Sequence, residues 1–265
     1  MKKHNYNPKK FILNAMLLLI LLPSMGFANK GIEVVKKYDE AYRGWNSYTV
    51  DSKMILKNQH GQASSRLLSG KYLEMHTDGD KSMIIFQSPR DVKGTAVLTY
   101  THKTGSDDQW LYLPAIKRVK RIASSNKSGP FVGSEFAYED LSSQEIEKFT
   151  YKHLKTEMLN GGLCEVIERD PIDPKSGYKH MHVWYNKDNN YRIEQIIFYD
   201  RKGSKFKTLK YIGYELFQDR YWFPKELHMS NHQSNKETRI LFDEYNFDSK
   251  LKENDFTQVR LKSAR

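Results

Sequence analysis

Few residues of this chain have the types and spacing that catalysis requires. The sequence of 265 residues holds no G-x-S-x-G nucleophile elbow and no G-x-x-x-x-G-K-[ST] phosphate loop. Asp107 and Asp108 form a carboxylate pair, but they follow Gly105 in a segment typical of a turn, where acidic residues are common. We therefore expect no catalytic site and a protein that is not an enzyme.

Two histidines could take part in metal binding. His180 and His182 are two residues apart in an expected strand, so both side chains would project from one face. Two imidazoles on one face could hold a metal ion, but the sequence shows no third ligand at a suitable spacing. We expect a solvated strand face, no metal and no cofactor.

The chain has one cysteine, Cys164, and therefore no internal disulfide. It lies in an apolar segment, 163–167, that is typical of a strand. No histidine or other base lies nearby in the sequence to activate the thiol, so we expect it to be buried and unreactive.

Aromatic residues make up 13% of the chain, with 17 tyrosines. Trp110 and Tyr112 would share one face of a strand, and Leu111 and Leu113 the other. In a sheet with one solvent-exposed face, only the other face is expected to be apolar, so a strand that is apolar on both faces is unusual. We expect one face to be covered only partly by a helix and a loop, which leaves an apolar cavity, although complete coverage of both faces is an alternative. The expected lining residues are Met83, Ile85, Trp110, Tyr112, Phe131, Phe136 and Phe198.

A basic strip occupies a later expected strand. Its members are Lys117, Arg118, Lys120 and Arg121. The strip suits docking to anionic lipid or to an acidic partner. Lysines that protect an edge strand from aggregation are the alternative.

The N-terminus follows the order of a secretory signal peptide. Basic residues precede an apolar run, 11–22, and the small-residue site ends at Ala28. The run is too short for a comfortable membrane span, although an uncleaved anchor is an alternative. We expect residues 1–28 to be removed and residues 29–265 to be a single periplasmic domain. Export argues against nucleic acid as the partner of a chain with a net charge of +11.

The elements that would position these residues are a helix and many strands. Helical spacing covers residues 31–45, and alternation then predicts strands at 48–57, 65–75, 81–87, 94–101, 109–113 and 116–122. A non-periodic stretch, 123–141, and a short helix at 142–149 follow. Further strands are expected at 151–158, 163–169, 180–186, 192–199, 208–217, 225–230 and 238–247. The pattern predicts one antiparallel sheet or barrel, built as a continuous meander, and a frayed C-terminus.

Several segments together resemble a known family. They are residues 88–96 (SPRDVKGTA), 108–115 (DQWLYLPA), 117–119 (KRV), 128–134 (SGPFVGS) and 138–141 (YEDL). The combination resembles the outer-membrane lipoprotein-sorting protein family related to the LolA carrier. The likeness is dense over residues 86–141 and looser over 30–262.

The resemblance implies a mainly β fold: an open, unclosed antiparallel β-barrel with an N-terminal helix and a helix or loop lid over an apolar cavity. It implies no catalytic motif. It also implies a periplasmic carrier of lipid or lipoprotein acyl chains, with an RND-type inner-membrane exporter and an outer-membrane acceptor as partners and transient contact with anionic membranes. A lipid-sensing adaptor of an envelope complex and an esterase or phospholipase are the alternatives.

Overall fold

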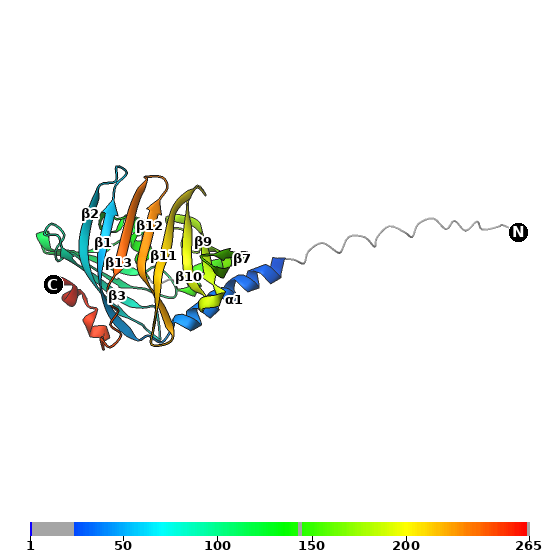
Figure 1. Cartoon of the computed structure of the whole chain (residues 1–265), viewed down its shortest axis with the longest axis horizontal. Helices are drawn as coiled ribbons and strands as arrows, with labels where there is room; N and C mark the ends of the chain where they lie inside the picture. The colour runs from blue at the N-terminus through cyan, green and yellow to red at the C-terminus, as the bar shows by residue number, and fades with distance from the viewer. Residues whose placement is uncertain (2–23, 143–144, 264–265) are drawn as a thin grey trace.

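The computed structural model describes Met1, residues 24–142 and residues 145–263, with side chains from Lys30 onward. The described part is one curved antiparallel sheet with a helix near each end of the chain (Figure 1). The apolar run of the expected signal peptide lies outside the described residues. None of the described helices is long and apolar enough to cross a membrane.

The sheet has thirteen strands. The first six are β1 (Ser47–Lys57), β2 (Ala63–Leu73), β3 (Lys81–Ser88), β4 (Ala96–Tyr100), β5 (Asp108–Leu113) and β6 (Arg118–Ile122). The other seven are β7 (Phe149–Leu159), β8 (Gly162–Pro171), β9 (Tyr178–Asn186), β10 (Arg192–Asp200), β11 (Lys205–Phe217), β12 (Tyr221–Asn231) and β13 (Lys236–Phe242). A strand is thus present at each position that alternation predicts, because period-two patterning is a local property of the sequence.

The strand order corrects the expected continuous meander. The order is β6-β5-β4-β3-β2-β1-β13-β12-β11-β10-β9-β8-β7, so two meanders meet where β1 pairs with β13. Buried Met54 and Ile240 are partners at this junction. The unpaired edges are β6 and β7, and the sheet does not close into a barrel. The open, mainly β fold is therefore confirmed.

Apolar clusters lie on both faces of the sheet. The inner face carries the main core, in which Val34, Phe86 and Val183 are buried. A second core lies behind β3 to β5 and contains Met83 and Leu98. Alternation along each strand explains the division, because successive side chains point to opposite faces.

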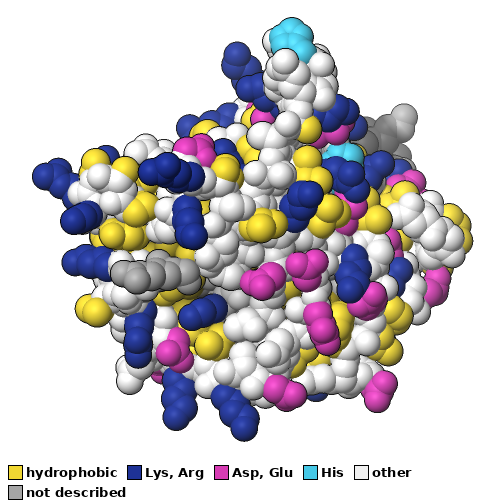
Figure 2. All heavy atoms as spheres, turned by 60° about the vertical axis from the view of Figure 1, so that its left-hand side comes forward, with side chains coloured by type: hydrophobic (Ala, Val, Ile, Leu, Met, Phe, Trp, Pro, Cys, Tyr) yellow, Lys and Arg dark blue, Asp and Glu magenta, His cyan; other side chains and the backbone are white. Residues whose placement is uncertain are grey.

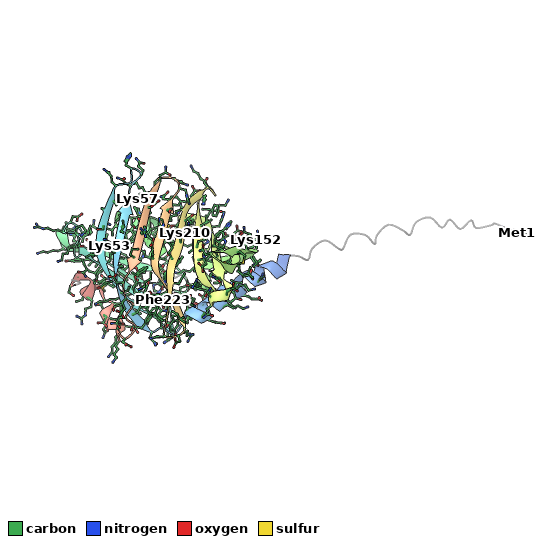
Figure 3. The ribbon with its side chains drawn as sticks, in the orientation of Figure 1. Met1, Lys53, Lys57, Lys152, Lys210 and Phe223 are labelled. Atoms are coloured by element: carbon green, nitrogen blue, oxygen red, sulfur yellow. The ribbon has the colours of Figure 1, made fainter. Side chains whose placement is uncertain are left out.

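The outer face of the central strands is solvated. Lys53 on β1 and Lys210 on β11 are both exposed there (Figure 3).

The first helix, α1 (Ser24–Tyr42), packs against β7. It begins before the expected start at residue 31 and runs through the expected cleavage point after residue 28. Gly31 permits the close approach, since a Cβ atom there would lie 3.1 Å from the backbone of Tyr151 and His153. Gly44, at a φ of 101°, ends the helical path, and the Glu74 carboxylate accepts its backbone N–H at 2.9 Å. Only a residue without a side chain adopts that φ freely.

Residues 123–148, here called the strap, connect the two edge strands. The remaining elements are short 3-10 turns at Pro114–Ile116, Ser124–Asn126, Phe131–Gly133, Tyr138–Leu141, Ile146–Lys148, Lys187–Asn189 and Glu253–Asp255. The turn at Ile146–Lys148 replaces the helix expected over 142–149, of which residues 143 and 144 lie outside the described part. The strap thus covers the sheet with irregular chain and single turns.

The chain is folded as far as Ser263, and residues 264 and 265, at the end that was expected to fray, lie outside the described residues. Helix α2 (Gln258–Lys262) packs against β4, β5 and β6. Phe256 and Leu261 are fully buried there in the second core. An apolar position every few residues is enough to hold this five-residue helix when a sheet offers a matching surface.

Candidate functional site

A cavity of about 450 Å³ lies between the strap, the β4–β5 loop and the inner face of β8 to β11. Apolar residues that line it include the inward-facing Met181, Ile196, Phe198, Leu209 and Tyr211. Charged and polar residues also line it, among them Lys103, Asp107, Lys127, Glu139, Asp140, Glu147, Lys148, Arg169 and Asp173. The volume lies within the range of small-molecule sites, roughly 300–1,000 Å³.

Strand register brings the apolar residues together. Phe198 of β10 is the partner of Met181 on β9, and Ile196 is the partner of Leu209 on β11. The intervening Ile197 points to the other face and packs in a separate cluster with Cys164. Side chains two residues apart on adjacent strands therefore form a continuous apolar wall.

A buried ion pair fixes the strap above this wall. Nζ of Lys207, on β11, lies 2.7 Å from Oδ2 of Asp140 in the strap, and the two side chains are only 3% and 2% exposed. The Tyr178 hydroxyl donates to Oδ1 of Asp140 at 2.7 Å, and Lys207 also donates to the Glu135 carbonyl at 3.1 Å. These hydrogen bonds satisfy both charges, which a buried pair needs in order to be stable.

Further polar contacts hold the strap to the segment before β9. The Glu139 carboxylate accepts hydrogen bonds from the Ser176 hydroxyl and the Gly177 backbone N–H, both at 2.8 Å. Burial raises the pKa of Glu139, and these donors partly oppose the increase. Lys148, at the end of the strap, pairs with Asp107 of the β4–β5 loop. The cavity roof is therefore anchored on both meanders.

The structure divides the seven residues expected to line a cavity. Phe198 lines this one. Phe131 and Phe136 are buried in the main core as parts of the strap. Met83 and Ile85 belong to the second core.

Trp110 and Tyr112 pack against that second core. Met83, Ile85, Trp110 and Tyr112 point away from the inner face, because alternation along β3 and β5 places them on the other side, which the C-terminal segment with Phe256 and Leu261 covers. They therefore do not share a space with Phe198.

The four residues of the expected docking patch, Lys117, Arg118, Lys120 and Arg121, are all exposed at the β6 edge. Arg121 forms an ion pair with Asp108. On the side of the molecule that carries α2, Lys and Arg side chains gather in one part and Asp and Glu in another (Figure 2). Both uses suggested by the sequence, edge protection and docking, suit this position.

Asp107 and Asp108 do more than shape a turn. Asp107 pairs with Lys148, and Asp108 opens β5. His102 lies between two carboxylates, with Nδ1 2.6 Å from Asp78 and Nε2 3.2 Å from Asp108. The hydrogen bond to Asp78 raises the pKa of His102 and lowers that of Asp78 to about 2. These contacts stiffen the loop that borders the cavity.

The structure confirms that the Cys164 thiol is buried, as the sequence predicts. Cys164 is fully buried on the outer side of β8, and burial raises its pKa to about 12.

A metal-capable group lies on the outer face. Glu168 of β8 is the register partner of His182 on β9, and with His180 it brings three ligand atoms within 4.8 Å of one another. The sequence could not supply this third ligand, because it comes from a neighbouring strand whose register is not visible in local spacing.

Sequence reasoning also missed Met181, Leu209, Tyr211 and Arg169. The apolar residues stand in ordinary alternation, and an available signal was that Ile196 and Phe198 share a face. No local sequence pattern predicts that an arginine near the end of a strand, such as Arg169, is buried.

The chain is similar to several proteins of known structure. It is 49% identical to a putative outer membrane lipoprotein-sorting protein domain from Vibrio parahaemolyticus, with a TM-score of 0.87, over 89% of this chain and 99% of the other. A DUF1329 family protein from Desulfovibrio piger is 23% identical, with a TM-score of 0.83 over 89% and 99%.

The likeness extends to more distant folds. A LolA superfamily protein from Nitrosomonas europaea is 17% identical, with a TM-score of 0.69 over 86% of this chain and 97% of the other, which shows a shared fold. A family model with the description of an uncharacterized protein matches residues 78–263. No curated protein matches the chain.

Proposed function

The chain belongs to the DUF1329 family of LolA-like, outer membrane lipoprotein-sorting proteins, and we propose that it is a carrier that binds the acyl chains of a lipid or lipoprotein. The observation that carries the proposal is the apolar wall inside the cavity of about 450 Å³. The 49% identical protein from Vibrio parahaemolyticus is described as a putative outer membrane lipoprotein-sorting protein domain, and lipoproteins are the same class of cargo.

Burial of an alkyl chain supplies the binding energy. Each methylene removed from water contributes about 0.8 kcal/mol, so ten methylenes contribute on the order of 8 kcal/mol. A bilayer offers nearly the same gain, and transfer between membrane and carrier is therefore close to neutral. The direction of transfer then depends on a donor that loads the carrier and on an acceptor that binds the cargo more tightly.

The proposed carrier works in the periplasm without catalysis. Residues 1–28 act as a cleaved signal peptide, and the β6 patch contacts an RND-type exporter, an outer-membrane acceptor or anionic lipid. Cell fractionation with N-terminal sequencing of the released protein tests the first part. Recovery of a chain that begins at Met1 in the inner membrane would refute export with cleavage.

A pair of matched variants tests the cavity. Ile196→Phe fills part of the cavity, whereas Ile197→Phe places the same ring on the other face of the same strand. We expect Ile196→Phe to weaken binding of a fluorescent fatty acid by about tenfold or more, since roughly 1.4 kcal/mol corresponds to tenfold. Ile197→Phe should bind like the wild type.

Native mass spectrometry of the purified protein gives an independent readout. We expect a co-purifying lipid that is lost from Ile196→Phe. Equal binding by both variants, or no uptake by the wild type, would contradict the proposal.

A further inference from the structure

A buried arginine lines the cavity. Arg169 of β8 is 3% exposed. One of its terminal nitrogens donates to Sδ of Met181 at 3.5 Å, and its guanidinium carbon lies 4.6 Å from the centre of the Phe149 ring. It also makes a side-chain hydrogen bond with Tyr185. All three neighbours are uncharged.

The guanidinium has unused binding capacity. Within the described residues its Nε atom has no hydrogen-bond partner. No carboxylate of these residues forms an ion pair with it, and the ion pairs of the adjacent Glu168 are with Lys152 and His182. Two of the three lysines at the same cavity differ, because Lys127 pairs with Asp173 at 2.7 Å and Lys148 pairs with Asp107. The third, Lys103, is only half-buried and keeps contact with solvent. Arg169 is therefore a buried cavity-lining cation without a carboxylate partner.

Such an arrangement is costly in the empty protein. A buried charge without a counter-charge is strongly destabilising, whereas a guanidinium binds a carboxylate or a phosphate through two parallel hydrogen bonds. A ligand that brings a negative group to Arg169 would thus restore the missing interaction. A neutral ligand would leave the charge uncompensated.

We propose that the cavity selects amphiphiles with an acidic head, a carboxylate or a phosphate monoester, which pairs with Arg169 while the chain lies against Met181, Ile196 and Leu209. This inference rests on the proposed acyl-chain binding and names its substrate class. Arg169 and Met181 are register partners, so the charged and apolar parts of the site are adjacent.

Ligand pairs of equal chain length test the inference. Binding of dodecanoic acid, dodecyl phosphate and methyl dodecanoate is measured by displacement of a fluorescent alkyl probe near neutral pH. We expect the wild type to prefer each acid over the ester by roughly 10- to 100-fold, the range for a hydrogen bond to a charged group. Arg169→Met should abolish the preference, and Arg169→Lys should retain part of it.

A matched control and a stability measurement separate recognition from folding. Arg192 pairs with Glu194 at 3.0 Å and does not line the cavity, so Arg192→Met should keep the acid preference. The urea midpoint of Arg169→Met should not fall, because the substitution removes an uncompensated charge. If that variant fails to fold, the acid-to-ester ratios of Arg169→Lys and Arg169→Gln decide.

The outcomes distinguish the two levels of the proposal. Equal affinity of the wild type for acids and ester would overturn the role of Arg169 and leave acyl-chain binding intact. No binding of any of the three ligands would overturn the proposed function itself. Displacement of the probe by inorganic phosphate as strongly as by dodecyl phosphate would overturn the assignment to an amphiphile.

A separate observation on the outer face carries a second inference. We infer that Glu168, His180 and His182 form a site for a divalent transition-metal ion. Nε2 of His182 lies 3.2 Å from Oε2 of Glu168, and all three residues are partly exposed. Metal bonds of about 2.0–2.2 Å place two ligands of one ion roughly 3 Å apart, so the spacing of His182 and Glu168 is already close to that of a shared ion. The third ligand, His180, lies within 4.8 Å of both and would move closer on binding.

The chemistry of the three side chains suits zinc, copper or nickel. Imidazole is a ligand for each of these ions, and a metal binds it in the neutral form. Lys152, whose Nζ lies 3.8 Å from the second Glu168 oxygen, is exposed and can swing away.

Calorimetry with ZnCl₂ on tag-free, EDTA-dialysed protein tests the site. We expect one ion per chain, with affinity reduced at least about tenfold by His180→Ala and by Glu168→Gln. His228→Ala is the control, because His228 also faces a carboxylate, Glu237 at 3.5 Å, but belongs to no three-residue group among the described residues. Absence of zinc binding by the wild type, or equal binding by the variants, would overturn the inference.

Discussion

Removal of the buried cation beneath the strap tests how the strap is fixed above the cavity. Lys207→Met replaces a 3% exposed ammonium with an apolar chain of similar length and leaves Asp140, which is 2% exposed, without its partner. Loss of one member of a buried pair costs about 3–5 kcal/mol. Contacts of Lys207 with the rings of Tyr178 and Phe198, 5.1 and 5.3 Å from Nζ, favour the upper part of that range.

Urea unfolding followed by tryptophan fluorescence measures the free-energy change. Asp140→Asn should be destabilised by a similar amount, because it leaves the ammonium buried. The double variant Lys207→Met/Asp140→Asn should be more stable than the sum of the single changes predicts, by roughly 1–3 kcal/mol, since the residues act as a pair. Single changes below about 1 kcal/mol, or strict additivity, would refute the argument that this pair fixes the strap.

Three further predictions concern other parts of the chain. Burial raises the pKa of Glu145 from 4.5 to about 7. The protonated carboxyl therefore contributes its full stability below about pH 4.5, and this contribution is lost as the pH rises through 7. Glu145→Gln should flatten the profile of unfolding free energy between about pH 5 and 8, and an unchanged profile would contradict this. Cys164 should resist alkylation by maleimide in the folded protein and react on unfolding; rapid native labelling would argue against its burial. Leu261→Ala should cost about 2–5 kcal/mol without changing affinity for a fatty acid, because α2 packs on the other face of the sheet, and a large loss of binding would disprove that separation.

The strands were predictable because their alternation is local. For example, the alternation places the side chains of Met83 and Ile84 on opposite faces of their strand, and the structure has them in different clusters. The pairing of Met54 with Ile240 was not predictable, because it joins strands almost two hundred residues apart and depends on the whole fold. The same limit hid Glu168, which reaches His182 only through strand register.

The position of the cavity could not be predicted from the sequence, because it depends on which segments cover each face of the sheet. Trp110 and Tyr112 have the composition of a ligand-binding wall, but the C-terminal segment occupies their side of the sheet. The sequence predicts only a closing turn near residues 254–257 in that segment, since Phe256 and Leu261 are separated apolar residues among polar and charged ones. Burial of Arg169 likewise follows from packing of the strap and strands, which no local pattern specifies.

Mapping of a bound chain tests the central claim most directly. A fatty acid with a photoactivatable diazirine on its alkyl chain is cross-linked to the protein, and the labelled residues are identified by peptide mass spectrometry. We expect labels on Met181, Ile196 and Leu209, which line the cavity under the strap. Labels confined to the α2 side of the sheet, on Met83 or Trp110, would contradict the account.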